Sequence, residues 1–221
     1  MNEAVRPVPE DVPIYGGNVN KAVLERVPKS ARRVLDVGCG TGTFGEVLKR
    51  SFGCTVVGIT HAEAEAREAR GVLDEVVVCD LEQADFSALG PFDCIICSHV
   101  LEHLRRPRDV LARLAERLAP DGTVVVALPN VLHWKQRLEF LRGRFRYTHG
   151  GLMDSTHVVF FDWDTARELV TQAGLRVDES MADGGFPGSR FLGKLGKMLD
   201  RSGLRRFPGS FGAQFVIVAR R

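Results

Sequence analysis

A short glycine-rich segment offers the first chemistry in this sequence. Gly38, Gly40 and Gly42 follow an apolar run directly and precede a helix-like stretch. Glycines permit a tight turn and a close approach of backbone to a ligand, and a helix start supplies N–H donors. The third glycine comes too early for the G-x-G-x-x-G loop of dinucleotide-binding proteins. Asp36, just before the loop, favours a ligand with a cationic amino group over a pyrophosphate.

The cysteines are a second group with chemical potential. Cys94 and Cys97 form a C-x-x-C pattern, which occurs in metal and redox sites. Side chains three apart on a strand point to opposite faces, so these two sulfurs should not meet. We therefore expect reduced, buried thiols and no metal site. The five cysteines are Cys39, Cys54, Cys79, Cys94 and Cys97.

Alternating elements must position these residues. Apolar, β-branched runs predict strands at 33–37, 55–59, 75–79, 93–98, 123–128, 175–181 and 214–219. Helical periodicity predicts helices at 43–51, 62–70 and 109–119, and another near 165–173. This alternation indicates an α/β fold, with a mostly parallel sheet and helices on both faces.

Local signals set two of the helix ends. Apolar residues at helical spacing, the last of them Leu118, predict that the helix over 109–119 is stopped by Pro120. Thr165 with Glu168 fits a capping box at the start of the following helix.

The whole chain, 1–221, is expected to be one domain. Residues 1–30 form an N-terminal lid segment. Two insertions, 131–157 after the fifth strand and 186–211 between the sixth and seventh, interrupt the alternation. Insertions at the carboxyl ends of parallel strands lie over the ligand crevice, so we expect both to be substrate-side cap elements.

The run from Val34 to Gly42 resembles motif I of class I S-adenosylmethionine-dependent methyltransferases. The run from Ser98 to Leu104 resembles the fourth motif and its following turn, and the resemblance extends from about Tyr15 to the C-terminus. It implies a Rossmann-like sheet of seven strands with an antiparallel last strand. The cofactor would be S-adenosyl-L-methionine and the product S-adenosyl-L-homocysteine. The implied cofactor-binding residues are Asp36, Gly38, Cys39, Gly40, Gly42, Thr60, Asp80, Leu81, Ser98 and His99.

Two of these positions have alternatives. Family members usually end the second strand with an acid that binds the ribose hydroxyls, but this chain has Thr60 there. A threonine hydroxyl forms a neutral and therefore weaker bond, which Thr60→Glu could strengthen. Asp80 matches the acid that contacts the adenine amino group, or it caps the segment that follows it.

Histidines are candidates for managing the proton of a methyl acceptor, because their pKa lies near neutrality. In phosphoethanolamine-type methyltransferases, a histidine placed like His103 pairs with an N-terminal tyrosine placed like Tyr15. His103 is thus the first candidate base and His157 the second, although His103 could merely pack its helix. The expected catalytic residues are His103, His157 and Tyr15.

The cap carries the information on substrate. Residues 128–144 resemble MetW-type homologues, whereas 150–161 look more like methyltransferases of polysaccharide and natural-product pathways. Basic residues dominate both insertions, which is typical of a solvated face or of an anionic acceptor. In 131–157 these are Lys135, Arg137, Arg142, Arg144 and Arg146, and in 186–211 they are Arg190, Lys194, Lys197, Arg201, Arg205 and Arg206. The helix pattern from Phe191 to Leu199 favours a lid, with membrane-surface contact as the alternative.

The bulk composition narrows the function. Apolar residues make up 44% and charged residues 26% of 221 residues, and the formal net charge is +2, so neither nucleic acid nor membrane insertion is expected. We expect a cytoplasmic O-methyltransferase, with a homodimer as one option. Its acceptor would be a small hydroxylated molecule such as a sugar or natural-product scaffold, with phosphorylated and carrier-linked forms included. N-methylation stays open, and the rival is a MetW-like cofactor-binding partner without turnover of its own.

Overall fold

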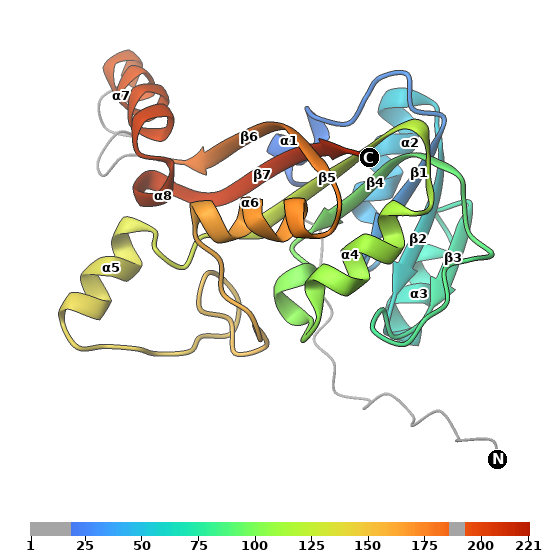
Figure 1. Ribbon diagram of the computed structural model, residues 1–221, viewed down its shortest axis with the longest axis horizontal. Helices are drawn as coiled ribbons and strands as arrows, with labels where there is room; N and C mark the ends of the chain where they lie inside the picture. The colour runs from blue at the N-terminus through green and yellow to red at the C-terminus, as the bar shows by residue number, and fades with distance from the viewer. Residues whose placement is uncertain (1–18, 186–192) are drawn as a thin grey trace.

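Seven strands form one continuous sheet in the order β3-β2-β1-β4-β5-β7-β6 (Figure 1). The structure is a computed structural model, and it describes residues 19–185 and 193–221. Every strand range predicted from the sequence corresponds to one of these strands. Their bounds are β1 (Arg33–Val37), β2 (Thr55–Thr60), β3 (Glu75–Val78), β4 (Phe92–Ser98), β5 (Leu118–Pro129), β6 (Arg176–Gly184) and β7 (Gly212–Arg220).

The strand directions confirm the expected topology. β1 pairs in parallel with β2 and β4, while β3 and β5 extend the parallel part on either side. β7 runs antiparallel to both β5 and β6. Parallel strands bring their carboxyl ends to one edge of the sheet, so the loops after β1, β2, β3 and β4 lie beside one another there.

Helices cover both faces of the sheet. Figure 1 shows α4 and α6 along one face, where their side chains Leu111 and Leu169 share one buried cluster. Leu48 of α2 and Ala69 of α3 belong to the second cluster on the opposite face. The bounds are α1 (Lys21–Leu24), α2 (Thr43–Phe52), α3 (Glu63–Ala69), η1 (Leu101–His103), α4 (Pro107–Ala115), α5 (Trp134–Leu141), α6 (Trp163–Gln172), α7 (Gly193–Arg206) and α8 (Pro208–Phe211).

The C-x-x-C pair spans the sheet as expected for a strand. Cys94 packs into the cluster that contains Leu48, whereas Cys97 packs into the cluster that contains Leu111. Both thiols are fully buried, and burial raises the pKa of each. The two sulfurs therefore face opposite sides and stay protonated, which confirms the strand-based prediction.

The boundary between α4 and β5 differs from the sequence-based expectation. α4 ends at Ala115, and Leu118 pairs with Phe92 as the first residue of β5. The register then shifts before Thr123 pairs with Cys94, so Pro120 lies in a bulge of β5. Because a bulge leaves backbone groups out of the ladder, it tolerates proline, which has no N–H to donate. The prediction that Pro120 stops a helix was therefore wrong.

The start of α6 also needs a correction. Its N-cap is Asp162, whose carboxylate accepts hydrogen bonds from the amides of Asp164 and Thr165. The Thr165 hydroxyl reaches back to the amide of Asp162, so Thr165 occupies the third helical position instead of the cap. A capping box is present, but it begins three residues before the predicted one, because aspartate caps as well as threonine.

The two cap elements project from one end of the sheet. Figure 1 shows α5, within 131–157, and α7 with α8, within 186–211, beyond the strands. None of the residues of α5 is buried. Of the expected apolar face of the second element, Met198 is 62% exposed, and Phe191 and Leu192 lie outside the described residues, as does the basic Arg190. No helix in the described ranges is long and apolar enough to cross a bilayer.

Candidate active site

The glycine loop joins β1 to α2 in a conformation that requires glycine. Gly38, Gly40 and Gly42 have positive φ values of 75°, 53° and 86°. A Cβ on Gly38 would lie 3.0 Å from the Val100 side chain, which belongs to the turn after β4. The loop therefore packs directly against that turn. This contact places the fourth-motif residues at the expected ligand crevice.

Some of the loop amides are already used within the protein. The N–H groups of Gly38 and Cys39 both donate to the carbonyl of Ile59, at 2.8 and 2.9 Å. The Cys39 side chain is buried beneath the loop and packs against Gly58. Cys39 thus packs beneath the loop, and its contribution to the cofactor site stays a prediction.

Asp36 carries a buried carboxyl group with no cation paired to it among the described residues. Its side chain is only 3% exposed, and Oδ2 has no hydrogen-bond partner among the described residues. Burial raises the pKa of this carboxyl to about 7. A buried carboxylate that lacks a partner is costly, so a ligand that brings an ammonium group would stabilise its ionised form.

A buried acid that was not among the predicted site residues, Glu65 of α3, lies beside the end of β2. The Thr60 hydroxyl donates to the Glu65 carboxylate, and Glu65 in α3 is only 3% exposed. The Thr60 hydroxyl, which was expected to donate a hydrogen bond to a ribose oxygen, therefore already donates one within the protein. A signal for this acid was present, because Glu65 falls on the same face as the buried Ala62, Ala66 and Ala69.

Asp80 and Leu81 follow β3 at the same edge of the sheet. The Asp80 carboxylate accepts hydrogen bonds from the Glu82 amide at 2.9 Å and from the Gln83 side chain at 2.7 Å. This supports the interpretation that Asp80 caps the next segment. Because Asp80 is exposed, its carboxylate also remains within reach of a ligand, and the adenine contact stays a prediction. The Leu81 side chain packs into the core.

Ser98 and His99 end β4 within a polar network. Ser98 accepts a hydrogen bond from Asn20 at 3.3 Å, and Asn20 also donates to Gln214 at 2.8 Å. His99 contacts Gln214 through Nε2 at 2.9 Å and Glu102 through Nδ1 at 3.2 Å. Its φ is +55°, the one positive value of a non-glycine residue in the described chain. Such a conformation costs energy, and its persistence here fits a functional turn.

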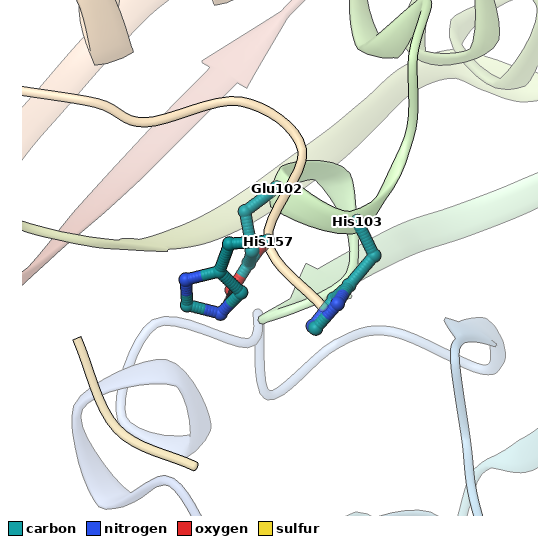
Figure 2. A group of neighbouring side chains, drawn as sticks. All are labelled: Glu102, His103 and His157. Carbon is teal, nitrogen blue, oxygen red and sulfur yellow. Dashed lines mark ion pairs between the residues drawn. The ribbon is translucent and has the colours of Figure 1, made fainter. Parts of the chain in front are cut away.

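His103 and His157 do come together, although they are far apart in sequence. Figure 2 shows both imidazoles pointing the same way as the Glu102 carboxylate, from η1 and from the loop that crosses it. The two rings meet edge to face with centroids 4.9 Å apart. The amides of Val158 and Val159 donate to the carbonyl of Glu102, at 2.8 and 3.1 Å, and pin the loop to the turn.

Hydrogen bonds fix the tautomer of His103. The Thr156 hydroxyl donates to Asp154 at 2.7 Å, so it must accept in its 3.0 Å contact with Nδ1 of His103. Nδ1 therefore carries the proton, and Nε2 keeps the lone pair when the ring is neutral. Desolvation acts to raise the pKa of Asp154, but the hydrogen bonds from Thr156 outweigh it and lower that pKa. Burial lowers the pKa of His157, which favours the neutral form of this ring.

The other predicted parts of the acceptor site are Tyr15 and the cap element that carries His157. Tyr15 lies outside the described residues, so its pairing with His103 stays a prediction. The loop carrying His157 is docked on η1, whereas α5 of the same cap element stands exposed. Rings of Phe140, Phe145, Tyr147 and Phe160 form an aromatic group that reaches His157, with the His157 and Phe160 centroids 6.1 Å apart.

Comparisons with known proteins agree with this arrangement. A family model described as a methyltransferase domain matches residues 15–180. A mitochondrial ubiquinone biosynthesis O-methyltransferase of Schizosaccharomyces pombe is 34% identical over 109 residues, which cover 47% of this chain and 40% of that protein. A trans-aconitate 2-methyltransferase of Methylobacterium nodulans is 36% identical over 115 residues, covering 50% and 43%. This chain spans less than half the length of these two curated relatives.

A solved structure shares the fold. The SAM-dependent methyltransferase of Archaeoglobus fulgidus superimposes with a TM-score of 0.62 at 22% identity, over 87% of each chain. The family match extends over most of the chain and includes the glycine loop, Asp36 and the turn after β4. This chain therefore belongs to the class I S-adenosylmethionine-dependent methyltransferases.

Proposed function

We propose that this chain transfers the methyl group of S-adenosylmethionine to a hydroxyl oxygen of a small acceptor. The observation that carries the proposal is the buried Asp36 carboxylate beside the glycine loop, whose Oδ2 has no hydrogen-bond partner in the part of the chain that the structure describes. The ammonium group of the methionine moiety is the cation that this position requires. The cofactor brings an already activated methyl group, so the protein mainly needs to orient the acceptor and remove one proton.

The choice of a hydroxyl acceptor rests on relatives and on the histidines. Several matching proteins are named ubiquinone biosynthesis O-methyltransferases, one of them from Thiobacillus denitrificans at 37% identity. An alcohol or phenol must lose a proton during methylation, whereas a neutral amine needs less help. His103, whose Nδ1 proton is bound by the Thr156 hydroxyl and whose Nε2 is left to accept a proton, suits this task. We therefore assign the activation of the acceptor hydroxyl to His103.

The aromatic group beside His157 supports an acceptor with an apolar face. Phe145 and Tyr147 are 57% and 56% exposed, although they contact other rings. A ring-shaped acceptor could stack on them while its hydroxyl reaches the histidines. The basic residues nearby give less support to an anionic acceptor, because Arg142 and Arg144 both pair with Glu139.

A turnover assay that measures the release of S-adenosylhomocysteine tests this function. The purified chain would be incubated with S-adenosylmethionine and with panels of phenols, sugars and amines, and the product would be quantified. We expect turnover with a hydroxylated acceptor. Tight cofactor binding without turnover on any panel would instead favour the MetW-like role of a cofactor-binding partner.

We also propose that the Glu65 carboxylate binds the ribose hydroxyls of the cofactor. It would replace the acid that family members usually have at the end of β2, where this chain has Thr60. Glu65→Gln should weaken binding of S-adenosylhomocysteine about tenfold, because a charge-assisted hydrogen bond becomes a neutral one. Glu63→Gln, an exposed change in the same helix, is the matched control and should leave affinity unchanged. Calorimetric titration measures both. Equal affinities for the two variants would remove Glu65 from the cofactor site.

The same contact reverses the expectation for Thr60→Glu. The hydroxyl of Thr60 bonds to a buried carboxylate, so a glutamate at position 60 would place a second negative charge against Glu65. Two buried like charges repel each other, and we now expect this variant to bind the cofactor less tightly than the unmodified chain.

A further inference from the structure

Glu102 presents a buried carboxyl group of which only one oxygen has a polar contact among the described residues. Its side chain is fully buried, and Oε1 contacts His99 at 3.2 Å. The second oxygen, Oε2, is buried and has no hydrogen-bond partner among the described residues. A carboxylate oxygen in this position normally has a donor or a cation beside it, because its desolvation is otherwise uncompensated.

Two imidazoles converge on this carboxylate. Nε2 of His157 lies 4.0 Å from Oε1 of Glu102, and the His157 side chain is only 6% exposed. One potential ligand atom from each of Glu102, His103 and His157 falls within 4.8 Å of the others. Figure 2 shows the three side chains directed toward the same space. This is the only such group of three or more candidate ligands found among the described residues.

We propose that Glu102, His103 and His157 bind a divalent transition-metal cation. Two imidazole nitrogens and one carboxylate oxygen form a ligand set that suits zinc, manganese or iron and leaves coordination positions open. Ligands on one such ion at about 2.0–2.2 Å lie at most about 4.4 Å apart, so a small rotation of the side chains completes the site. This assignment departs from the expectation of a chain without metal that the cysteines suggested.

The surroundings of His103 and Glu102 fit the same role. Metal-binding histidines usually donate their second ring N–H to an oxygen, which fixes the ring and the tautomer. Nδ1 of His103 makes such a contact with the Thr156 hydroxyl, which in turn donates to Asp154. His99 contacts the same Glu102 oxygen, Oε1, that faces Nε2 of His157, and it thereby helps to hold the carboxylate in place. Thr156, Asp154 and His99 are therefore positioning residues for this site.

The role of the cation rests on the proposed function. An acceptor hydroxyl bound at an open position would have a lower pKa and would release its proton to solvent water. Its oxygen then forms the new bond to the methyl carbon, and the carbon–sulfur bond breaks. The electron pair of that bond remains on sulfur, which converts the sulfonium into the neutral thioether of S-adenosylhomocysteine. His103 then activates the hydroxyl by holding the cation.

Metal binding is tested without cofactor or acceptor, so its failure is separate from a failure of methyl transfer. The chain would be stripped with a chelator and titrated with Co²⁺ and Zn²⁺ by calorimetry and visible absorption. We expect one site per chain, and a cobalt spectrum without the charge-transfer band that thiolate ligands produce. Glu102→Gln and His157→Ala should each weaken binding at least tenfold, since even the loss of a supporting contact costs about 10–100-fold.

His149→Ala is the matched control, because His149 is an exposed histidine in the same cap element. It should bind both cations as the unmodified chain does. Circular dichroism checks folding. If replacement of the buried Glu102 and His157 unfolds the chain, the cation affinity of His103→Ala, which replaces a half-buried side chain, tests the site instead. Absence of stoichiometric binding to the unmodified chain, or equal affinity of folded ligand variants and control, would overturn the metal site. Glu102 and the histidines would then be a hydrogen-bonded network alone.

Discussion

Replacing His103 by alanine should slow methyl transfer to a hydroxyl acceptor by roughly 10²–10⁴-fold. The reason is the fixed tautomer, in which Thr156 holds the Nδ1 proton and Nε2 keeps a lone pair. That lone pair activates the acceptor whether it takes the proton directly or binds a cation. Single-turnover rates with a saturating hydroxylated acceptor measure the effect, and calorimetry should show nearly unchanged cofactor affinity.

His157→Ala belongs in the same assay, because this ring lies edge to face with His103. If neither substitution slows transfer by even tenfold, positioning of the acceptor alone accounts for catalysis. An amine, or an acceptor that is already ionised, would then replace the hydroxyl in the proposed reaction.

The second large effect concerns stability and Asp36. Burial raises the pKa of this carboxyl in the folded chain from 3.8 to about 7. A folded-state pKa above the unfolded value adds stability that is complete below pH 3.8 and is lost as the pH rises to about 7. Between pH 5 and pH 7, the unmodified chain should thus lose about 2–3 kcal/mol relative to Asp36→Asn, which has no proton to release.

Denaturant unfolding of the cofactor-free proteins at several pH values gives these free energies. Asp121→Asn, which removes an exposed carboxyl from β5, is the matched control and should follow the unmodified chain. Parallel pH profiles for the unmodified chain and Asp36→Asn would show that Asp36 is ionised in the free protein. The argument that it needs a cationic ligand would then lose its basis.

The strands were predictable because they are local. Each buried run, such as Arg33–Val37, contains enough apolar and β-branched residues to be identified as a strand from its own sequence. The alternation of such runs with helices implies a parallel sheet. The start of β5 was missed because Leu118 fits both a helical face and a strand. Its pairing with Phe92, 26 positions earlier, decided between the two, and no local pattern contains that information.

The site was predictable in its parts but not in its contacts. The glycine loop and Asp36 stand next to each other in sequence, so their joint role could be inferred. His103 and Thr156 are 53 residues apart, and their contact depends on how the loop after α5 folds back onto η1. The burial of Glu65 on the apolar face of α3 could be inferred from its spacing, but its hydrogen bond with Thr60 depends on how α3 packs beside the end of β2.

Calorimetric titration with S-adenosylhomocysteine at pH 8, where Asp36 is mostly ionised, tests the central claim most directly. The account predicts one binding site in the unmodified chain, no binding of NAD, and a loss of about 1.5–3 kcal/mol in Asp36→Asn, as expected when a charged hydrogen bond disappears. Equal affinity of the two proteins for S-adenosylhomocysteine would contradict the assignment of Asp36 and the glycine loop as the cofactor site.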